Sequence, residues 1–180
     1  MASGLNEYHT LELKESARIT SRRLWLLLLL LVSAWSILII APAIAAANGS
    51  DSAASGLYSF FGYICHQRPD RSFHLLGHKL GVCSRCFGVY LGLVVGVLAY
   101  PLFRNISEIK PLPLFWLVLS MIPIGIDWSL TVFGIWENTF FTRFATGLVL
   151  GTACSVFVIP ALSELAHVYH FRRSQVPAGT

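Results

Sequence analysis

Three cysteines and a group of histidines lie close together in the sequence, and their spacing suits metal binding. Cys83 and Cys86 are three residues apart, so on a helix they share a face and both sulfurs can reach one ion. Cys65 adds a third sulfur, and thiolates and imidazoles are ligands of zinc in its tetrahedral sites. The fourth ligand would be one of three nearby histidines, His66, His74 or His78. The pattern predicts a zinc site, although it lacks the second close cysteine pair of a zinc ribbon.

The same cysteines are compatible with two other kinds of site. A Cys-x-x-Cys pair at an outer membrane face suits thiol–disulfide exchange, with Cys65 as its partner. A purely structural disulfide is the third interpretation, because an oxidising exterior favours such bonds, but three cysteines do not pair evenly. The fourth cysteine, Cys154, lies deep in an apolar stretch and is interpreted as a packing residue.

A carboxylate within an apolar stretch is the next candidate for chemistry. Placing Asp127 in a membrane span costs ~2.5–3.5 kcal/mol on insertion scales, so it must face a partner or a cavity. Arg143 is the expected partner, because a rise of about 1.5 Å per residue places both side chains at similar depths. Such a pair either fixes helix register or holds a functional carboxylate. Asn138 is expected to hydrogen-bond into this group or to cap the following helix.

Three arginines accompany these residues. Arg71, Arg85 and Arg143 carry guanidinium groups, which are suited to bidentate binding of phosphate or carboxylate. They indicate a lipid head group or another small anion as a ligand. For each arginine singly, interfacial anchoring or ion pairing with Asp70 or Asp127 is the alternative.

The elements that position these residues are predicted to be membrane helices. Of the 180 residues, 55% are hydrophobic and 12% are charged, against about 25% charged in a soluble domain. Four stretches are long and apolar enough to cross a ~30 Å hydrocarbon core, namely 24–47, 80–103, 111–134 and 140–165. The first run is longer than the core of a signal peptide, so we interpret it as a retained anchor. The predicted fold class is an all-α polytopic membrane protein of about four transmembrane helices.

Two further patterns refine this fold. The aromatic stretch 57–64 has helical spacing but is too short to span, and it predicts a short interfacial helix. Glycines recur every four residues in the second and fourth spans: Gly88, Gly92 and Gly96, then Gly147 and Gly151. Small residues at this spacing allow helices to approach closely in lipid, so we expect these faces to pack against other helices.

Lysine and arginine positions predict how the chain lies in the membrane. With both termini cytoplasmic, eight of these residues fall inside and five outside. The organisation is then a cytoplasmic tail over 1–23, a four-helix membrane domain over 24–166 and a cytoplasmic tail over 167–180. An extracytoplasmic Cys/His loop occupies 48–86, and nearly all the unusual polar residues are expected near the outer face. We expect a multi-pass protein of the cell membrane. No basic stripe interleaved with aromatics indicates nucleic-acid binding.

Two motifs resemble those of a widespread prokaryotic family of small integral membrane proteins, defined by a domain of unknown function. Residues 65–73 (CHQRPDRSF) and 82–90 (VCSRCFGVY) are similar to its CHQxPxRSF and CxRCxGxY signature. Asp127 and residues 138–147 resemble its later aspartate and its N-x4-R-x2-TG element. The resemblance covers about residues 57–152. It favours His66 as the fourth ligand, because His66 belongs to the shared motif, but it names no reaction.

The chain departs from this family pattern at two positions. It has Phe87 where the family usually has threonine, and Trp128 where the family commonly has glycine. An indole beside Asp127 is expected to narrow the cavity that this carboxylate faces.

These observations combine into one predicted site. An extracytoplasmic zinc ion would be bound by Cys65, His66, Cys83 and Cys86, with His78 as the alternative ligand. The adjoining polar pocket would consist of Asp127, Arg143, Asn138 and Arg85. An enzyme of this kind would use the metal to polarise a bond or activate water, with Asp127 as acid or base, on a lipid or a small anionic substrate. The alternatives are a quinone-linked thiol–disulfide oxidoreductase and a non-enzymatic scaffold or subunit stapled by metal.

Overall fold

The computed structural model describes the backbone of residues 2–175 and the side chains of residues 14–169 and 171. Its elements are α1 (Ala2–Leu38), α2 (Ala41–Ala47), α3 (Asp51–Gly62), η1 (Pro69–Arg71), β1 (His74–Leu75), β2 (His78–Lys79), α4 (Ser84–Phe103), α5 (Phe115–Val132) and α6 (Phe140–Gln175). Four segments are long and apolar enough to cross a membrane, namely Lys14–Ala47, Ser84–Phe103, Phe115–Val132 and Phe140–Tyr169. The predicted all-α polytopic membrane fold is confirmed.

The first span differs from its prediction at both ends. α1 begins at Ala2, so the polar segment expected as a tail continues the helix. The chain then turns after Leu38 and resumes as α2, with Pro42 in its first turn. Proline has no backbone N–H, and it suits the first turn of a helix because an N–H there would have no partner within the helix. The predicted span 24–47 is therefore two helices joined by a corner.

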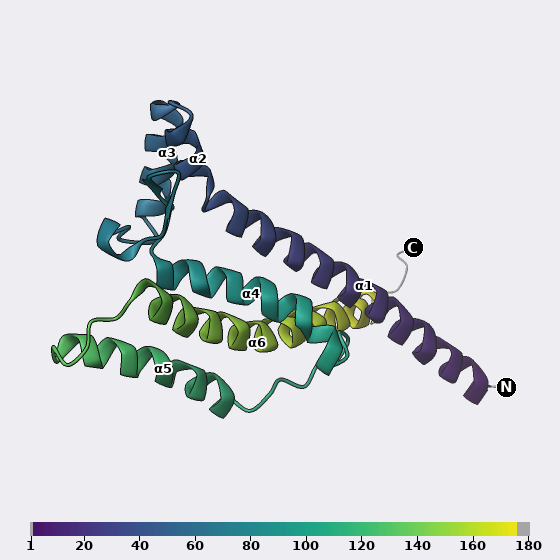
Figure 1. The fold of residues 1–180 in the computed structure, drawn as a ribbon. Helices are drawn as coiled ribbons and strands as arrows, with labels where there is room; N and C mark the ends of the chain where they lie inside the picture. Colours follow the sequence, from purple (N-terminus) through teal and green to yellow (C-terminus); the bar gives the residue numbers. More distant parts are fainter. Residues whose placement is uncertain (1, 176–180) are drawn as a thin grey trace.

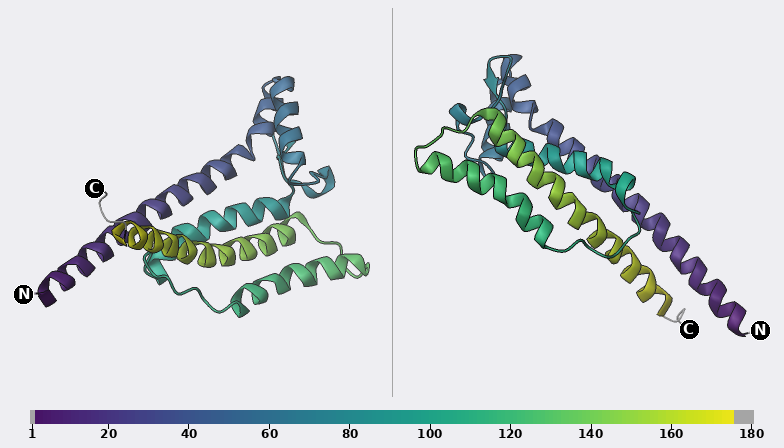
Figure 2. Two further views of the ribbon diagram at one scale, coloured as in Figure 1. Left: turned by 180° about the vertical axis from the view of Figure 1, so that it is seen from behind. Right: turned by 60° about the horizontal axis from the view of Figure 1, so that its bottom comes forward.

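The central pair of the bundle is α4 and α6, which lie side by side (Figures 1 and 2). Their glycines explain this close approach. A Cβ at Gly88 would overlap the Phe144 carbonyl oxygen, and one at Gly151 would overlap the Val89 carbonyl oxygen. The predicted small-residue faces of the second and fourth spans therefore pack directly against each other.

α1 packs across this pair. Trp25 donates its indole N–H to the Val97 carbonyl of α4 at 2.9 Å, and packs on a buried cluster of Val97, Tyr100 and Ile159. Contacts with both α4 and α6 fix the position of α1 in the bundle.

α5 is the least enclosed helix of the bundle. It packs mainly against α6, and of its residues, all of which the structure describes, only Ser120 is buried. Figures 1 and 2 show it along one edge of the molecule, joined to α4 and α6 by extended segments. Its exposed apolar side chains are those expected of a helix that faces lipid.

One end of the bundle is covered by α2, α3 and the segment leading to α4. Phe61, Ile39 and Val82 form the buried centre of this cap. The Gly81 N–H donates to the Ile39 carbonyl at 2.9 Å, and a Cβ on Gly81 would press on the Phe61 ring. The cap thus connects the corner after α1 to the start of α4.

The cap also contains a short hairpin that the sequence analysis did not predict. β1 and β2 pair antiparallel through a two-residue turn, Leu76-Gly77, in which both residues have positive φ angles of 52° and 83°. Such a turn matches the twist of a hairpin. His74 and His78 therefore lie on opposite strands of this hairpin.

Candidate metal centre and polar pocket

The sulfurs of Cys65, Cys83 and Cys86 converge at the first turn of α4. All three Sγ atoms lie within 4.8 Å of one another. Cys83 is the residue that precedes the helix, and Cys86 lies in its first turn, so their three-residue spacing brings both sulfurs to Cys65. Zinc–sulfur bonds of ~2.3 Å in a tetrahedron place sulfurs about 3.8 Å apart, so small movements would close this group around one ion.

The surroundings of Cys65 favour a thiolate. The Cys83 backbone N–H donates to the Cys65 sulfur at 3.2 Å. The pKa of the Cys65 thiol is lowered, because the thiols of Cys83 and Cys86 and this amide donate to its sulfur. The first turn of α4 adds the partial positive charge of a helix N-terminus. A thiolate is the form of cysteine that binds metal.

A set of loop hydrogen bonds holds Cys65 in place. Gln67, two residues on, has a φ of 46°, and its side chain is buried and donates to the Tyr58 carbonyl at 2.7 Å. Lys79 donates to the Gln67 carbonyl at 3.0 Å, and the Tyr58 hydroxyl donates to the Lys79 carbonyl at 2.5 Å. This role of Gln67 was not predicted from the sequence, where its position between His66 and Arg68 of the first motif was the available signal.

The predicted histidine ligands do not join the sulfur group. His66, His74 and His78 are all exposed, and in the described part of the chain only the three cysteines form a group close enough to share an ion. His66 follows Cys65 directly, but Cys65 is 7% exposed while His66 faces outward. Among the described residues, no side chain therefore fills the fourth coordination position.

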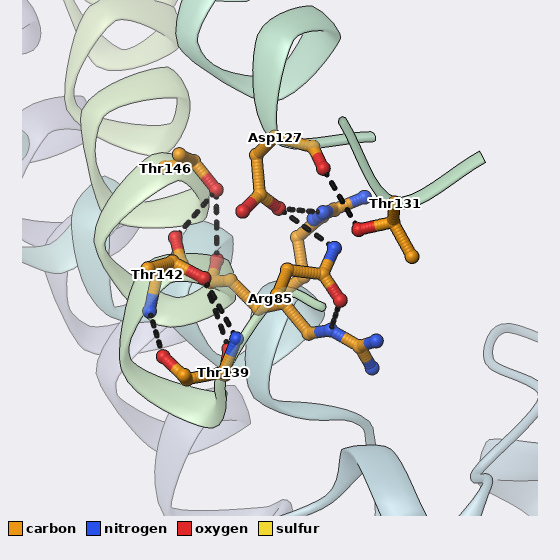
Figure 3. A network of polar contacts seen from close by, with 8 residues as sticks. Arg85, Asp127, Thr131, Thr139, Thr142 and Thr146 are labelled. Carbon is orange, nitrogen blue, oxygen red and sulfur yellow. Dashed lines mark hydrogen bonds and ion pairs between the residues drawn. The ribbon is translucent and has the colours of Figure 1, made fainter. Parts of the chain in front are cut away.

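Asp127 pairs with a different arginine from the one predicted. Arg85 of α4 forms an ion pair with Asp127 Oδ2, and Asn138 donates to the same oxygen at 3.0 Å (Figure 3). Arg143 donates through Nε to Asn138 Oδ1 at 2.6 Å, so Asn138 separates it from the carboxylate. The prediction of a direct Asp127–Arg143 pair is wrong, because Arg85 lies at the same level and reaches Asp127 from the neighbouring helix.

Hydroxyl groups support the ends of the helices around this network. The Thr131 hydroxyl donates to the Asp127 carbonyl at 3.0 Å. At the start of α6, the Thr139 and Thr142 side chains accept each other's backbone N–H groups, a reciprocal capping arrangement drawn in Figure 3. These threonines were not predicted from the sequence.

A cavity of about 200 Å³, here called the polar pocket, adjoins the sulfurs. It is lined by Arg71, Cys83, Arg85, Cys86, Trp128, Thr131, Val132, Asn138 and Arg143. A metal ion held by the cysteines would therefore face this cavity. The predicted pocket residues are brought together here, with Asp127 behind Arg85 and Asn138.

Aromatic side chains connect the cap to α4 and α6. Phe73 packs edge-on against Phe87 and Phe144, with ring centroids 6.2 and 5.8 Å away. Phe87 also packs on Phe144 at 5.9 Å. Phe87 of α4 therefore packs between the cap and α6.

The family assignment follows from residues that include this whole site. The model of the family described as "Predicted membrane protein (DUF2085)" matches residues 65–157, slightly more than half of the chain. The chain belongs to this family. The matched range contains all three clustered cysteines and the Asp127 network.

Two curated relatives agree with this assignment. An uncharacterized protein of Methanocaldococcus jannaschii is 35% identical over 111 residues, which cover 62% of this chain and 71% of the relative. An uncharacterized protein of Methanothermobacter thermautotrophicus is 37% identical over 110 residues, which cover 60% of this chain and 96% of the relative. No solved structure matches the chain.

Proposed function

We propose that the chain is a zinc-dependent membrane enzyme that acts on an anionic substrate at the extracytoplasmic face. The metal would be bound by Cys65, Cys83 and Cys86. The observation that carries this proposal is the opening of the sulfur group onto a pocket lined by arginines. A structural zinc site is closed by four protein ligands, whereas a catalytic one keeps a position for water or substrate.

The position of the sulfurs supports an open site. Cys83 and Cys86 line the polar pocket, while Cys65 is buried in the cap behind them. The exposed His66 leaves the fourth position to a water molecule or a substrate atom on the pocket side. A zinc ion at this position would polarise a substrate bond or lower the pKa of its bound water.

The charges around the pocket support an anionic substrate. Arg71, Arg85 and Arg143 line the cavity, and Arg85 is balanced by Asp127. Asp70 lies 3.5 Å from Arg71 Nε, but its side chain is 57% exposed and also contacts Arg68, so solvent weakens that pair. Three thiolates would give a zinc centre one negative charge, and the pocket would still have an excess of positive charge.

Asp127 serves best as a positioning residue. Its side chain is 10% exposed, and one of its oxygens accepts from both Arg85 and Asn138. In this arrangement Asp127 orients Arg85, and Asn138 orients Arg143, toward the bound anion. A zinc ion held by the three cysteines would supply the chemistry that acts on this anion.

Elemental analysis of the purified full-length protein tests the metal centre. We expect one zinc per chain, lost in Cys83→Ser because three sulfurs are needed to hold the ion. Cys154→Ser is the matched control, since Cys154 lies in α6 outside the sulfur group, and this variant should keep its zinc. A metal-free protein with a reducible bond between Cys83 and Cys86 would overturn the proposal.

That last outcome would favour a thiol–disulfide oxidoreductase instead. The specific observation behind this second candidate is the close approach of three free thiols with one thiolate favoured among them. A low thiol pKa and nearby sulfurs are properties of cysteines that exchange disulfides.

A third outcome would favour a scaffold stapled by metal. In that case the protein would be loaded with metal, Asp127→Asn would have no effect on cellular function, and Cys65→Ser would lower the abundance of the protein.

A further inference from the structure

Two apolar cavities flank the interface of α5 and α6. The larger has a volume of about 670 Å³ and lies between Trp116–Pro123 of α5 and Leu148–Val156 of α6. Its lining side chains are almost entirely apolar. Since α5 packs mainly on α6, this cavity is open along the edge of the molecule.

A second apolar cavity lies on another face of α5 and adjoins the polar pocket. It has a volume of about 290 Å³ and is lined by Met121, Gly125, Trp128 and Leu150, among others, with Arg85 at its end. Trp128 and Arg85 also line the polar pocket. We call this second cavity the α5–α6 groove, which leads along α5 to the arginines.

The groove is long enough for part of one lipid chain. From Met121 to Trp128, which both line it, the helix rises ~10 Å at ~1.5 Å per residue. A hydrocarbon core of ~30 Å gives each leaflet ~15 Å, so the groove covers about two thirds of one leaflet. A hydrocarbon tail whose head group lies in the polar pocket can therefore lie along this part of α5.

The charge distribution selects the head group. The groove is apolar along α5 and adjoins the polar pocket, which is lined by Arg71, Arg85 and Arg143. The Nε atoms of Arg71 and Arg85 are buried and make no hydrogen bond among the described residues, although the exposed Asp70 carboxylate lies 3.5 Å from Arg71 Nε. Guanidinium groups of this kind bind phosphate oxygens in pairs, and such bonds are stronger in a site sheltered from water.

We propose that the polar pocket and the α5–α6 groove bind one membrane lipid with a phosphate head group. Its phosphate contacts the three arginines beside the sulfurs, and its hydrocarbon chain occupies the groove. The lipid enters sideways from the bilayer past α5. This inference rests on the proposed anionic substrate and names its class. A helix of a second copy would fill only the apolar part and leave the arginines without an anion.

Competition between two lipids tests the inference directly. The purified full-length protein is mixed with equal amounts of phosphatidic acid and phosphatidylcholine, and the bound lipid is measured by native mass spectrometry. We expect phosphatidic acid to bind about tenfold more tightly, because its phosphate is unscreened by a choline group. Inorganic phosphate at the same concentration should not displace it, since it lacks the tail.

Two variants locate the bound lipid. Arg71→Gln should lower the preference for phosphatidic acid by removing one guanidinium. Gly125→Phe should lower binding of both lipids by filling the groove, because a Cβ at Gly125 meets no atom within 4 Å and the ring can enter that space. Ile126→Phe is the matched control, as Ile126 is 55% exposed and does not line the groove, and its lipid binding should equal that of the unmodified protein.

The outcomes separate this inference from the proposed function when zinc is measured in the same samples. One zinc per chain with equal binding of the two lipids would overturn the lipid inference and leave the metal centre standing. Equal losses in Gly125→Phe and Ile126→Phe, or displacement by inorganic phosphate, would also overturn it. The inference would also be overturned if the protein formed a dimer that binds no phosphatidic acid and if Gly125→Phe dissociated that dimer. Selective lipid binding by a zinc-free protein would support the inference while refuting the zinc enzyme.

Discussion

At the scale of single residues, the network around Asp127 shows how a carboxylate is accommodated in an apolar helix. One oxygen of Asp127 accepts from Arg85 on α4 and from Asn138, which precedes α6. Asn138 in turn accepts from Arg143. A single, largely enclosed charge therefore connects three helices through one ion pair and two further hydrogen bonds, and its removal leaves Arg85 without a counter-ion.

We expect Asp127→Asn to lower the melting temperature in detergent, because Arg85 is only 24% exposed and would lose its negative partner. Breaking a buried pair costs about 3–5 kcal/mol, and the partial exposure reduces this to about 1–3 kcal/mol. Glu108→Gln is the matched control. It removes the Arg104–Glu108 pair, whose glutamate is 38% exposed, and should cost about 0–1 kcal/mol. Equal shifts for both variants would contradict this account.

The sequence predicted which residues form this site better than it predicted their contacts. The close approach of the Cys83 and Cys86 sulfurs follows from their three-residue spacing, which the sequence itself gives. The choice between Arg85 and Arg143 as the partner of Asp127 could not be made, because depth in the membrane is one coordinate and both arginines share it. His66 was chosen by motif membership, which does not say where a side chain faces.

At the scale of elements, the α4–α6 contact is the most specific packing in the chain. Gly88, Gly92 and Gly96 of α4 each face backbone or side-chain atoms of α6, and Gly147 and Gly151 face α4 in return. Van der Waals contact between close backbones is a main source of helix association in lipid. The first turn of α4, which carries the sulfurs, is held by this contact.

Gly92→Leu should therefore destabilise the bundle. Its side chain would overlap the Leu148 backbone, which cannot rotate away, at a cost of at least about 1–3 kcal/mol. The expected result is a lower melting temperature in detergent and reduced abundance in the membrane. Gly125→Ala, which changes a glycine of α5 with open space around it, should cause no loss. A stable Gly92→Leu protein would show that α4 and α6 do not pack in this way.

Hydropathy and glycine spacing predicted these elements because both signals are carried by a single helix. The hairpin at β1–β2 was missed, since its turn uses Leu76 at a positive φ where a glycine or asparagine is the usual signal. The extension of α1 to Ala2 was also missed. Residues 11–18 are good helix formers, but their charges were interpreted as a tail instead.

At the scale of the whole molecule, the cap and the sulfur group lie at one end of the bundle and the connection from α4 to α5 lies at the other (Figure 1). The distribution of lysine and arginine favours the first end as the extracytoplasmic one. This orientation remains a prediction, and it decides which compartment would supply the proposed metal and substrate.

Single cysteines introduced at the two ends test the orientation. Tyr63 is 92% exposed beside the cap, and Lys110 is exposed in the opposite connection. In intact cells a membrane-impermeant maleimide should label Tyr63→Cys, whereas Lys110→Cys should react only after permeabilisation. The unmodified protein, measured in parallel, gives the background from its own thiols. The reverse pattern would place the sulfur group on the cytoplasmic side.

The hydrogen bond from Gly81 to Ile39 gives the first span a direct mechanical connection to the sulfurs. Gly81 is two residues from Cys83, and Ile39 directly follows the end of α1. A helix that is longer than the local bilayer tilts to match it, and a tilt of α1 would move the Ile39 carbonyl. We therefore expect zinc affinity to vary with acyl-chain length in reconstituted vesicles, so that membrane thickness itself tunes the centre.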